Sequence, residues 1–113
     1  MKLDTEKLLA IVNKIKENII IVEGRNDIKA LEAVSLSAKN IIAINGRSLI
    51  KVVEQIANKK VKEVVILTDF DEKGKELAAE LTKLLQAYKI HPNKRLRKLF
   101  TQFGKNAIED VKI

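Results

Sequence analysis

The chain has 113 residues, of which 46% are hydrophobic, so it is long enough and apolar enough for one domain around one packed core. The absence of cysteine excludes disulfides, thiolate metal sites and cysteine nucleophiles, and no apolar run reaches the roughly 18–20 residues that span a membrane. The first residues do not resemble a signal peptide. We therefore expect a single domain over residues 1–113 in a cytoplasmic protein with no membrane partner.

The net charge of +7 arises in one part of the chain. Residues 81–108 contain seven of the 22 basic side chains and no acidic one, whereas the other 15 bases are matched by 15 acids. A local excess of positive charge is typical of a surface that binds a polyanion, and nucleic acid is the usual one. A solvated helix face is the alternative interpretation, and the charge alone favours neither.

Helical and strand patterns alternate along the first half of the chain. Residues 4–17 have helical spacing of apolar side chains, and NIIIVEG (18–24) is a β-branched run that predicts a buried strand. A helix is expected over 26–36, with Asn26 or Asp27 near its start. NIIAING (40–46) predicts a second strand that ends in an Asn-Gly turn, and Ser48 is expected to cap the next helix.

The second half continues this alternation. EVVILTD (63–69) predicts the third strand, residues 72–88 the longest helix, and YKIHP (88–92) a weak fourth strand. A basic amphipathic helix is expected over about 93–104. Strands that alternate with helices of this length imply right-handed crossovers. The predicted fold is therefore α/β, a Rossmann-like three-layer arrangement with a parallel sheet of about four strands and helices on both faces.

Acidic residues stand where two predicted strands end. Ligands of parallel sheets bind beyond the carboxyl ends of the strands, and these ends carry Glu23 and the pair Asp69 and Asp71. Three carboxylates a few ångströms apart would repel one another unless a cation joined them. Ligands that are all oxygen favour Mg²⁺ or Mn²⁺, and magnesium suits phosphoryl transfer. We therefore predict a metal site at Glu23, Asp69 and Asp71.

Local spacing supports this site and also leaves simpler roles open. Residues i and i+2 of a strand point to the same side, so Asp69 and Asp71 can face one crevice while Phe70 turns to the core. Gly74 would allow a tight path into the next helix, and Gly24 would leave room for substrate beside Glu23. Alternatively, Asp71 caps the 72–88 helix, Glu23 is a solvated turn residue, and Asp27 caps its helix or orients Arg25.

These stretches together resemble the Toprim domain family. IIIVEGRNDIKALE (19–32) resembles its first signature, a strand that ends in Glu-Gly, and VVILTDFDEKGKELAAEL (64–81) resembles its second, a strand that ends in Asp-x-Asp. IIAINGRSLIKVVEQI (41–56) resembles the strand, Gly46 turn and helix between them. The resemblance covers residues 18–88 directly, with a core of about 18–90. The EGRND form resembles most closely the ribosomal-RNA maturation nuclease and small stand-alone primase-like members.

The resemblance implies roles for individual residues. In catalytic Toprim proteins, which include topoisomerases, primases and nucleases, the glutamate serves in acid/base chemistry and the Asp-x-Asp pair holds magnesium. These roles carry to Glu23, and to Asp69 and Asp71. The expected function is magnesium-dependent phosphodiester hydrolysis or transfer on nucleic acid, DNA or RNA, in the manner of a nuclease, RNA-processing factor or primase. The bases expected to hold the nucleic acid are Arg25, Lys73, Lys94, Arg95, Arg97 and Lys98.

The chain also departs from the better-known members. Its only tyrosine, Tyr88, is remote from the acidic motifs in sequence, and it has neither the zinc module nor the polymerase subdomain of primases. One alternative is therefore a non-catalytic module that binds metal and nucleic acid and acts with a partner subunit. A homodimer through the N-terminal helix is a further option. A more remote alternative is a receiver-type phosphoacceptor domain, with Asp69 at the end of the third strand.

Overall fold

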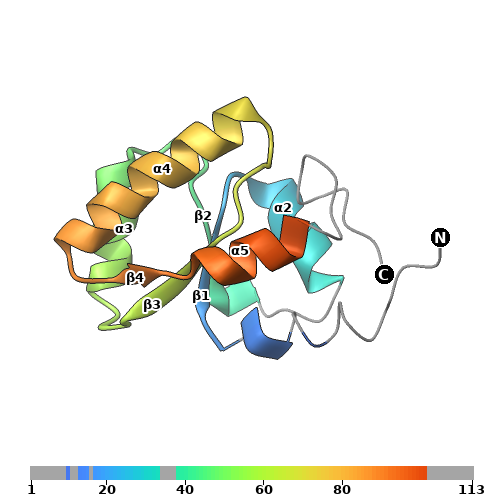
Figure 1. Cartoon of the computed structure of the whole chain (residues 1–113), viewed down its shortest axis with the longest axis horizontal. Coiled ribbons are helices and arrows are strands. Elements are labelled where there is room, and N and C mark those ends of the chain that lie inside the picture. The colour runs from blue at the N-terminus through green and yellow to red at the C-terminus, as the bar shows by residue number, and fades with distance from the viewer. Residues whose placement is uncertain (1–9, 11–12, 16, 34–37, 102–113) are drawn as a thin grey trace.

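The computed structural model describes residues 10, 13–15, 17–33 and 38–101. In chain order the elements are β1 (Ile19–Val22), α2 (Arg25–Glu32), the short 3₁₀ helix η1 (Ala38–Asn40), β2 (Ile41–Ala43), α3 (Leu49–Ala57), β3 (Glu63–Ile66), α4 (Glu72–Ala87), β4 (His91–Pro92) and α5 (Lys94–Thr101). The predicted alternation of strands and helices is thereby confirmed (Figure 1).

The four strands form one parallel sheet in the order β2-β1-β3-β4. In the register of this sheet, Ile20 of β1 lies between Ile41 of β2 and Val65 of β3. The strands that carry the two acidic motifs, β1 and β3, are therefore neighbours inside the sheet. Their carboxyl ends lie at the same edge because the strands are parallel.

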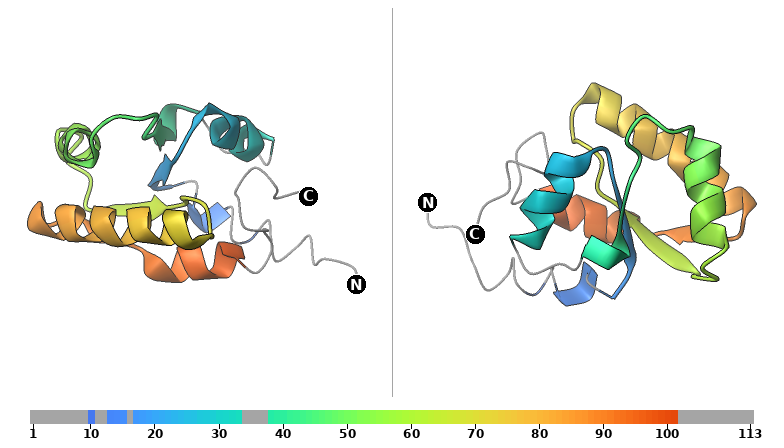
Figure 2. Two further views of the ribbon diagram at one scale, coloured as in Figure 1. Left: turned by 90° about the horizontal axis from the view of Figure 1, so that it is seen from above. Right: turned by 180° about the vertical axis from the view of Figure 1, so that it is seen from behind.

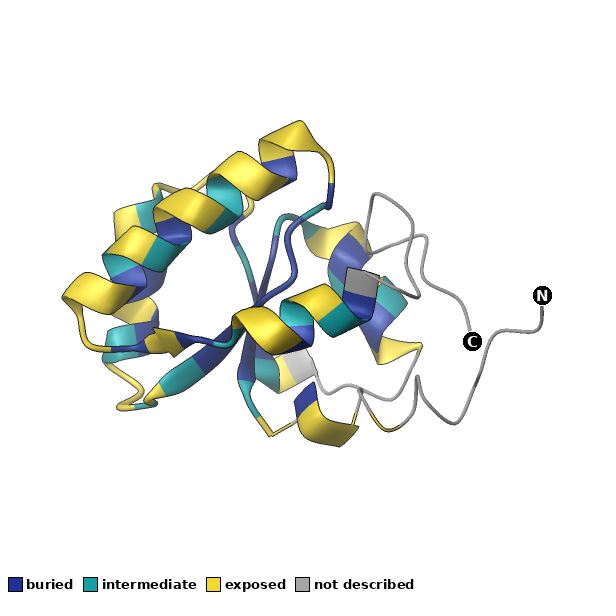
Figure 3. Ribbon diagram, in the orientation of Figure 1, coloured by how far each residue is buried: buried dark blue, intermediate teal, exposed yellow. Residues whose placement is uncertain are grey.

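The alternation of side chains along each strand divides the core into two layers. Ile20 and Val22 of β1 pack on the face covered by α2 and α5, whereas Ile19 and Ile21 pack on the face covered by α3 and α4. The right-hand view in Figure 2 shows α2 and α5 on one side of the strands and α3 and α4 on the other. Figure 3 shows buried strands and helices that are exposed on their outer sides. This arrangement confirms the predicted three-layer α/β fold.

The edge strand β4 is short and contains the single proline of the chain. The backbone N–H groups of His91 and Asn93 donate to the carbonyl oxygens of Lys62 and Val64, at 2.7 and 2.8 Å. Pro92, between them, occupies the position whose backbone nitrogen faces away from β3, where a missing N–H removes no bond of the ladder. The weak fourth strand predicted from the sequence is therefore real and lies at the edge that proline tolerates.

Several predicted bounds change in the structure. The α2 helix begins at Arg25 with Gly24 as its N-cap, so Asp27 lies in the first turn rather than at the cap. Most of the predicted 4–17 helix, residues 34–36 and residues 102–104 lie outside the described residues, although residues 13–15 are helical and Ile15 is buried. In the described part of the chain, no helix is long and apolar enough to cross a membrane.

Candidate active site at the carboxyl ends of β1 and β3

The two acidic motifs meet through one hydrogen bond. Glu23 follows β1 directly, and its Oε2 accepts a 2.7 Å bond from the backbone N–H of Asp69, beyond β3. The preceding backbone bond between the strands runs from Leu67 N to Ile21 O. The Glu23 side chain therefore takes over the pairing of the two segments where the backbone ladder ends. Phe70 turns into the core, as predicted, and is buried.

Asp71 is the N-cap of α4. Its Oδ1 accepts a 2.8 Å hydrogen bond from the backbone N–H of Gly74, which satisfies one of the free donors in the first turn. This is the capping role that the sequence left open. One carboxylate oxygen of Asp71 is therefore directed at the start of α4, and not at the crevice that was predicted beside Asp69. Its predicted part in metal binding stays a prediction.

Gly74 lies where the first turn of α4 approaches the Asp69 peptide. A Cβ atom on Gly74 would lie 1.8 Å from the Asp69 carbonyl oxygen and 2.4 Å from its carbonyl carbon. The buried Thr68 hydroxyl donates a 2.8 Å hydrogen bond to the Gly74 carbonyl oxygen across the same contact. The tight path predicted for Gly74 is therefore a close backbone contact, which holds the acidic loop against the helix.

Arg97 holds the segment after β3 from the other side. Its Nη1 donates to the carbonyl oxygens of Ile66 and Thr68 at 3.1 and 3.0 Å, and its Nη2 donates to that of Asp69 at 3.1 Å. Its guanidinium carbon also lies 5.0 Å from the centroid of the Phe70 ring. Burial lowers the pKa of Arg97, while the nearby charges of Glu23 and Asp69 act to raise it.

We predicted Arg97 to bind nucleic acid, and the structure shows that it also has an internal role. Three of its guanidinium donors bind backbone carbonyl oxygens, and carbonyl oxygens leave no mark in a sequence. Position 97 lies beside the buried stripe of Leu96 and Phe100 on α5, which is the one signal that could have indicated it. The phosphate role predicted for Arg97 is not tested.

The other predicted bases do not all lie at one edge of the sheet. Arg95 lines a cavity with Asn18 and Glu63, at the amino ends of β1 and β3. Arg25 and Lys73 are in the first turns of α2 and α4, and Lys94 begins α5. Arg95 and Lys98 follow on α5. All five side chains are exposed. Arg25 and Lys73 thus stand at the helix starts that follow the two acidic motifs, whereas Lys94 follows β4, which pairs with the start of β3.

The Asn-Gly turn after β2 is present, and it contains an arginine that we did not single out. The N–H of Arg47 donates to the carbonyl oxygen of Ile44, and both Asn45 and Gly46 have positive φ values, of 53° and 78°. The Arg47 guanidinium donates to the carbonyl oxygens of Ile44 and Ala43 and to Oε1 of Gln55. Arg47 therefore stabilises the turn that Gly46 permits.

A cavity of about 370 Å³ opens beside Glu23. It brings together three of the predicted site residues, Glu23, Gly46 and Lys73. Asp69 and Asp71 are not among the residues that line it. The cavity therefore lies on the β2 side of Glu23, between the Asn-Gly turn and the first half of α4.

Asp27 has a supporting position next to this site. Its Oδ2 accepts a 3.0 Å hydrogen bond from the backbone N–H of Gly24, directly after Glu23. The side chain is buried, and its Oδ1 has no hydrogen-bond partner. Asp27 thus fixes the peptide that follows the catalytic candidate, rather than orienting Arg25 as one alternative held.

The donor atoms suit a hard cation, although not in the arrangement predicted. Within the described ranges, no three His, Cys, Asp or Glu side chains are grouped closely enough to hold a metal ion. The expectation of three converging carboxylates is therefore not met there. Glu23 and Asp69 both lie close enough to Arg97 to influence its pKa, so these two carboxylates share one end of the sheet. Magnesium often uses only one or two carboxylates, with water and substrate phosphate as the other ligands, and this pair fits such a site.

Comparison with known proteins agrees with this fold and site. The Toprim domain model matches residues 18–103. A UPF0292 protein of Methanocaldococcus jannaschii is 32% identical over 110 residues, covering 94% of this chain and 85% of the relative. A UPF0292 protein of Thermococcus kodakarensis is 40% identical over 112 residues, covering 94% and 81%.

A solved structure of a protein from Aquifex aeolicus superimposes with a TM-score of 0.82 at 25% identity, covering 98% of this chain and 100% of that one. The resemblance noted from the two acidic signatures is thereby confirmed. From its motifs, its sheet and these matches, the chain belongs to the Toprim domain family.

Proposed function

We propose that this protein cleaves or transfers phosphodiester bonds in nucleic acid with the help of Mg²⁺ or Mn²⁺, as a nuclease, RNA-processing or primase-like enzyme. Metal-dependent processing of nucleic acid is what Toprim membership supports at the level of the family. The observation that carries the proposal for this chain is the 2.7 Å bond between Glu23 and Asp69. It joins the two acidic motifs at the sheet edge where parallel folds bind their ligands.

Glu23 is the proposed acid/base residue. Its Oε2 is held by the Asp69 amide, so the orientation of the carboxylate is set by the backbone of the neighbouring motif. Its Oε1 forms no hydrogen bond with a described residue, which leaves that atom to exchange a proton with the attacking or leaving oxygen. The carboxylate also lines the cavity of about 370 Å³, where substrate could approach it.

Asp69 and Asp71 are the proposed residues for holding the metal, together with Glu23. When bound, the ion would supply electrostatic stabilisation of the charge that develops on the phosphate. The chain itself keeps the two aspartates in place. Gly74 lies against the Asp69 peptide, and its backbone N–H donates to Oδ1 of Asp71. Arg25, Lys73, Lys94, Arg95 and Lys98 would hold the phosphate backbone through charge.

A non-catalytic module that binds metal and nucleic acid with a partner subunit is the second candidate. It is supported by the capping bond of Asp71, which engages one of the three acids expected to take part in catalysis. The receiver-type alternative has lost its basis, since the Toprim model matches the whole region from β1 to α5.

The decisive experiment compares the wild type with Asp69→Asn and Asp71→Asn. Mn²⁺ binding is followed by electron paramagnetic resonance, and cleavage is assayed on labelled single- and double-stranded DNA and RNA. Glu76→Gln, an exposed acid on α4, is the control for loss of one negative charge. The enzyme proposal expects metal binding and cleavage in the wild type and control, and loss of both in the two variants.

Two other results are informative. Metal and nucleic-acid binding without cleavage of any substrate would contradict the enzyme for the isolated chain and support the binding module. Unchanged Mn²⁺ affinity in both variants would show that the metal assignment itself is wrong.

A further inference from the structure

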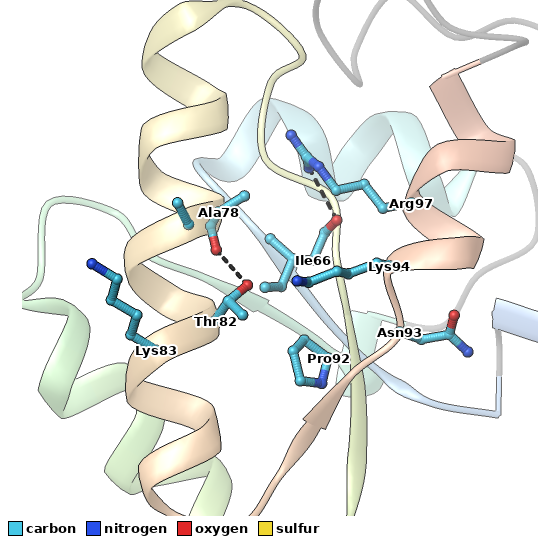
Figure 4. Close-up of a pocket in the computed structure, with 9 residues that line it drawn as sticks. Ile66, Ala78, Thr82, Lys83, Pro92, Asn93, Lys94 and Arg97 are labelled. Atoms are coloured by element: carbon cyan, nitrogen blue, oxygen red, sulfur yellow. Dashed lines mark hydrogen bonds between the residues drawn. The ribbon is translucent and has the colours of Figure 1, made fainter.

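A second cavity, of about 480 Å³, lies between α4 and α5 on the β4 side of the sheet. It shares no lining residue with the cavity beside Glu23. Figure 4 shows it bounded by β3, β4, one side of α4 and the start of α5. The lining residues are Ile66, Ala78, Ala79, Thr82, Lys83, Pro92, Asn93, Lys94 and Arg97. Its volume is within the range of small-molecule sites, about 300–1,000 Å³.

The floor of this cavity offers apolar contact. Ile66 and Pro92 are buried, and Ala78 packs against the core. The uncharged polar groups are already engaged: the Thr82 hydroxyl donates to the Ala78 carbonyl oxygen at 2.7 Å. The Asn93 amide group donates to Glu63 and accepts from the backbone N–H of Leu96. A ligand would therefore be recognised in the floor by its apolar surface rather than by hydrogen bonds.

All charged residues that line the cavity are basic. Arg97 uses its guanidinium on carbonyl oxygens of the β3 segment, whereas Lys83 and Lys94 form no hydrogen bond or ion pair with a described residue. In Figure 4 the Lys94 side chain extends across Ile66 toward α4, and Lys83 projects from the outer side of α4. The Lys94 ammonium therefore remains available to an anion inside the cavity, whereas the Lys83 ammonium points away from it. No acidic side chain in the lining competes for Lys94.

We propose that this cavity binds a nucleotide unit, with its base on the floor of Ile66, Ala78 and Pro92 and its phosphate near Lys94. A nucleobase presents a planar ring face that can pack against apolar side chains, and the attached phosphate carries the negative charge that a lysine binds. The choice of a nucleotide among amphipathic anions rests on the proposed function. The unit is either a free mononucleotide or one nucleotide of a strand.

Arg97 connects this cavity to the acidic motifs. It lines the cavity and donates to the Asp69 carbonyl oxygen. The Arg97 side chain would therefore lie between a nucleotide bound here and the backbone of Asp69. The site would then fix one nucleotide of a strand while another part of the strand lies at the candidate active site. A free nucleotide would instead act as a small effector, through the contact between Arg97 and the Asp69 carbonyl oxygen.

Nuclear magnetic resonance titrations of the full chain test this inference with three probes. These are adenosine 5′-monophosphate, a short single-stranded oligonucleotide and inorganic phosphate. We expect a nucleotide probe to shift the backbone amide resonances of Ala78, Thr82 and Lys94. Inorganic phosphate should bind at least about tenfold more weakly than the nucleotide, because it makes no contact with the apolar floor. Shifts from the oligonucleotide alone identify a strand as the source, and shifts from the monophosphate identify the free nucleotide.

Matched variants separate the cavity from general charge effects. Ala79→Leu should fill the mouth and abolish the shifts, whereas Ala87→Leu, also exposed on α4 but outside the cavity, should not. Lys94→Gln should weaken binding about tenfold. Lys83→Gln, whose ammonium points away from the cavity, and Lys29→Gln on α2 should leave it unchanged.

Asp69→Asn with Asp71→Asn should also leave this binding unchanged, which separates the cavity from the proposed active site. The inference is overturned if no nucleotide probe shifts the cavity resonances, if phosphate binds as tightly as the nucleotide, or if Ala79→Leu binds like the wild type. Loss of cleavage in the aspartate variants with retained nucleotide binding would support the proposed function and show that the cavity binds independently of the aspartates.

Discussion

The backbone N–H of Asp69 donates a 2.7 Å hydrogen bond to Oε2 of Glu23, and the two residues are 46 positions apart in the chain. The bond lies where the backbone ladder of β1 and β3 ends. The backbone of the Asp69 motif thereby fixes the orientation of the Glu23 carboxylate. Glu23 therefore supports the local fold in addition to its proposed roles in metal binding and proton transfer, and substitutions must be chosen to separate these roles.

Glu23→Ala and Glu23→Gln should differ in stability although both remove the charge. Alanine leaves the partly buried Asp69 amide without its acceptor, which should lower the free energy of unfolding by about 1–2 kcal/mol. Glutamine can still accept that bond and should cost less. Urea denaturation measures both, and Mn²⁺ titration should show weakened binding in each. Equal stability of the two variants would contradict the structural role of the bond.

Gly74→Ala should be strongly destabilising because its Cβ would lie 1.8 Å from the Asp69 carbonyl oxygen. Backbone atoms must move to relieve the overlap, so we expect a loss of at least about 2–3 kcal/mol in the free energy of unfolding. Gly24→Ala is the matched control. No atom lies within 4 Å of its added Cβ and its φ of −148° is ordinary, so thermal unfolding should change little. Similar losses in the two variants would refute the close contact as the cause.

Arg97→Lys should loosen the acidic loop. A lysine keeps the charge but cannot reproduce the planar fork that reaches the carbonyl oxygens of Ile66, Thr68 and Asp69. We expect a loss of about 1–3 kcal/mol in stability. Amide hydrogen exchange at Asp69 should also be faster. Arg95→Lys, exposed on the same helix, is the control and should alter neither quantity. An unchanged exchange rate in Arg97→Lys would mean that Arg97 does not position the loop.

Asp71→Asn and Asp71→Ala should separate capping from metal binding. Asparagine is about as good an N-cap as aspartate, whereas alanine should cost about 1 kcal/mol of stability through loss of the bond to Gly74. If Asp71 also holds a metal, the asparagine variant should bind Mn²⁺ more weakly while it unfolds at nearly the wild-type urea concentration. Wild-type Mn²⁺ affinity in that variant would restrict Asp71 to its capping role.

Local patterns were sufficient to predict the elements. The β-branched runs, their glycine and asparagine ends, and the capping serine of α3 all act within a few residues, so strand order along the chain and the parallel class of the sheet could be predicted. The same holds for the meeting of Glu23 with the segment of Asp69, because parallel strands bring their carboxyl ends to one edge.

What the sequence by itself determined was therefore the alternation of helices and strands, the Toprim signatures and the edge where the acids gather. The tertiary structure decided the rest: that Asp71 caps α4, that Arg97 binds three carbonyl oxygens, and that α4 and α5 enclose a basic-rimmed cavity. The physical reason is the identity of the partners. Every residue has a backbone carbonyl and a peptide group, and many sequences give the same spacing of helices. No residue pattern therefore predicts which of these groups a side chain contacts.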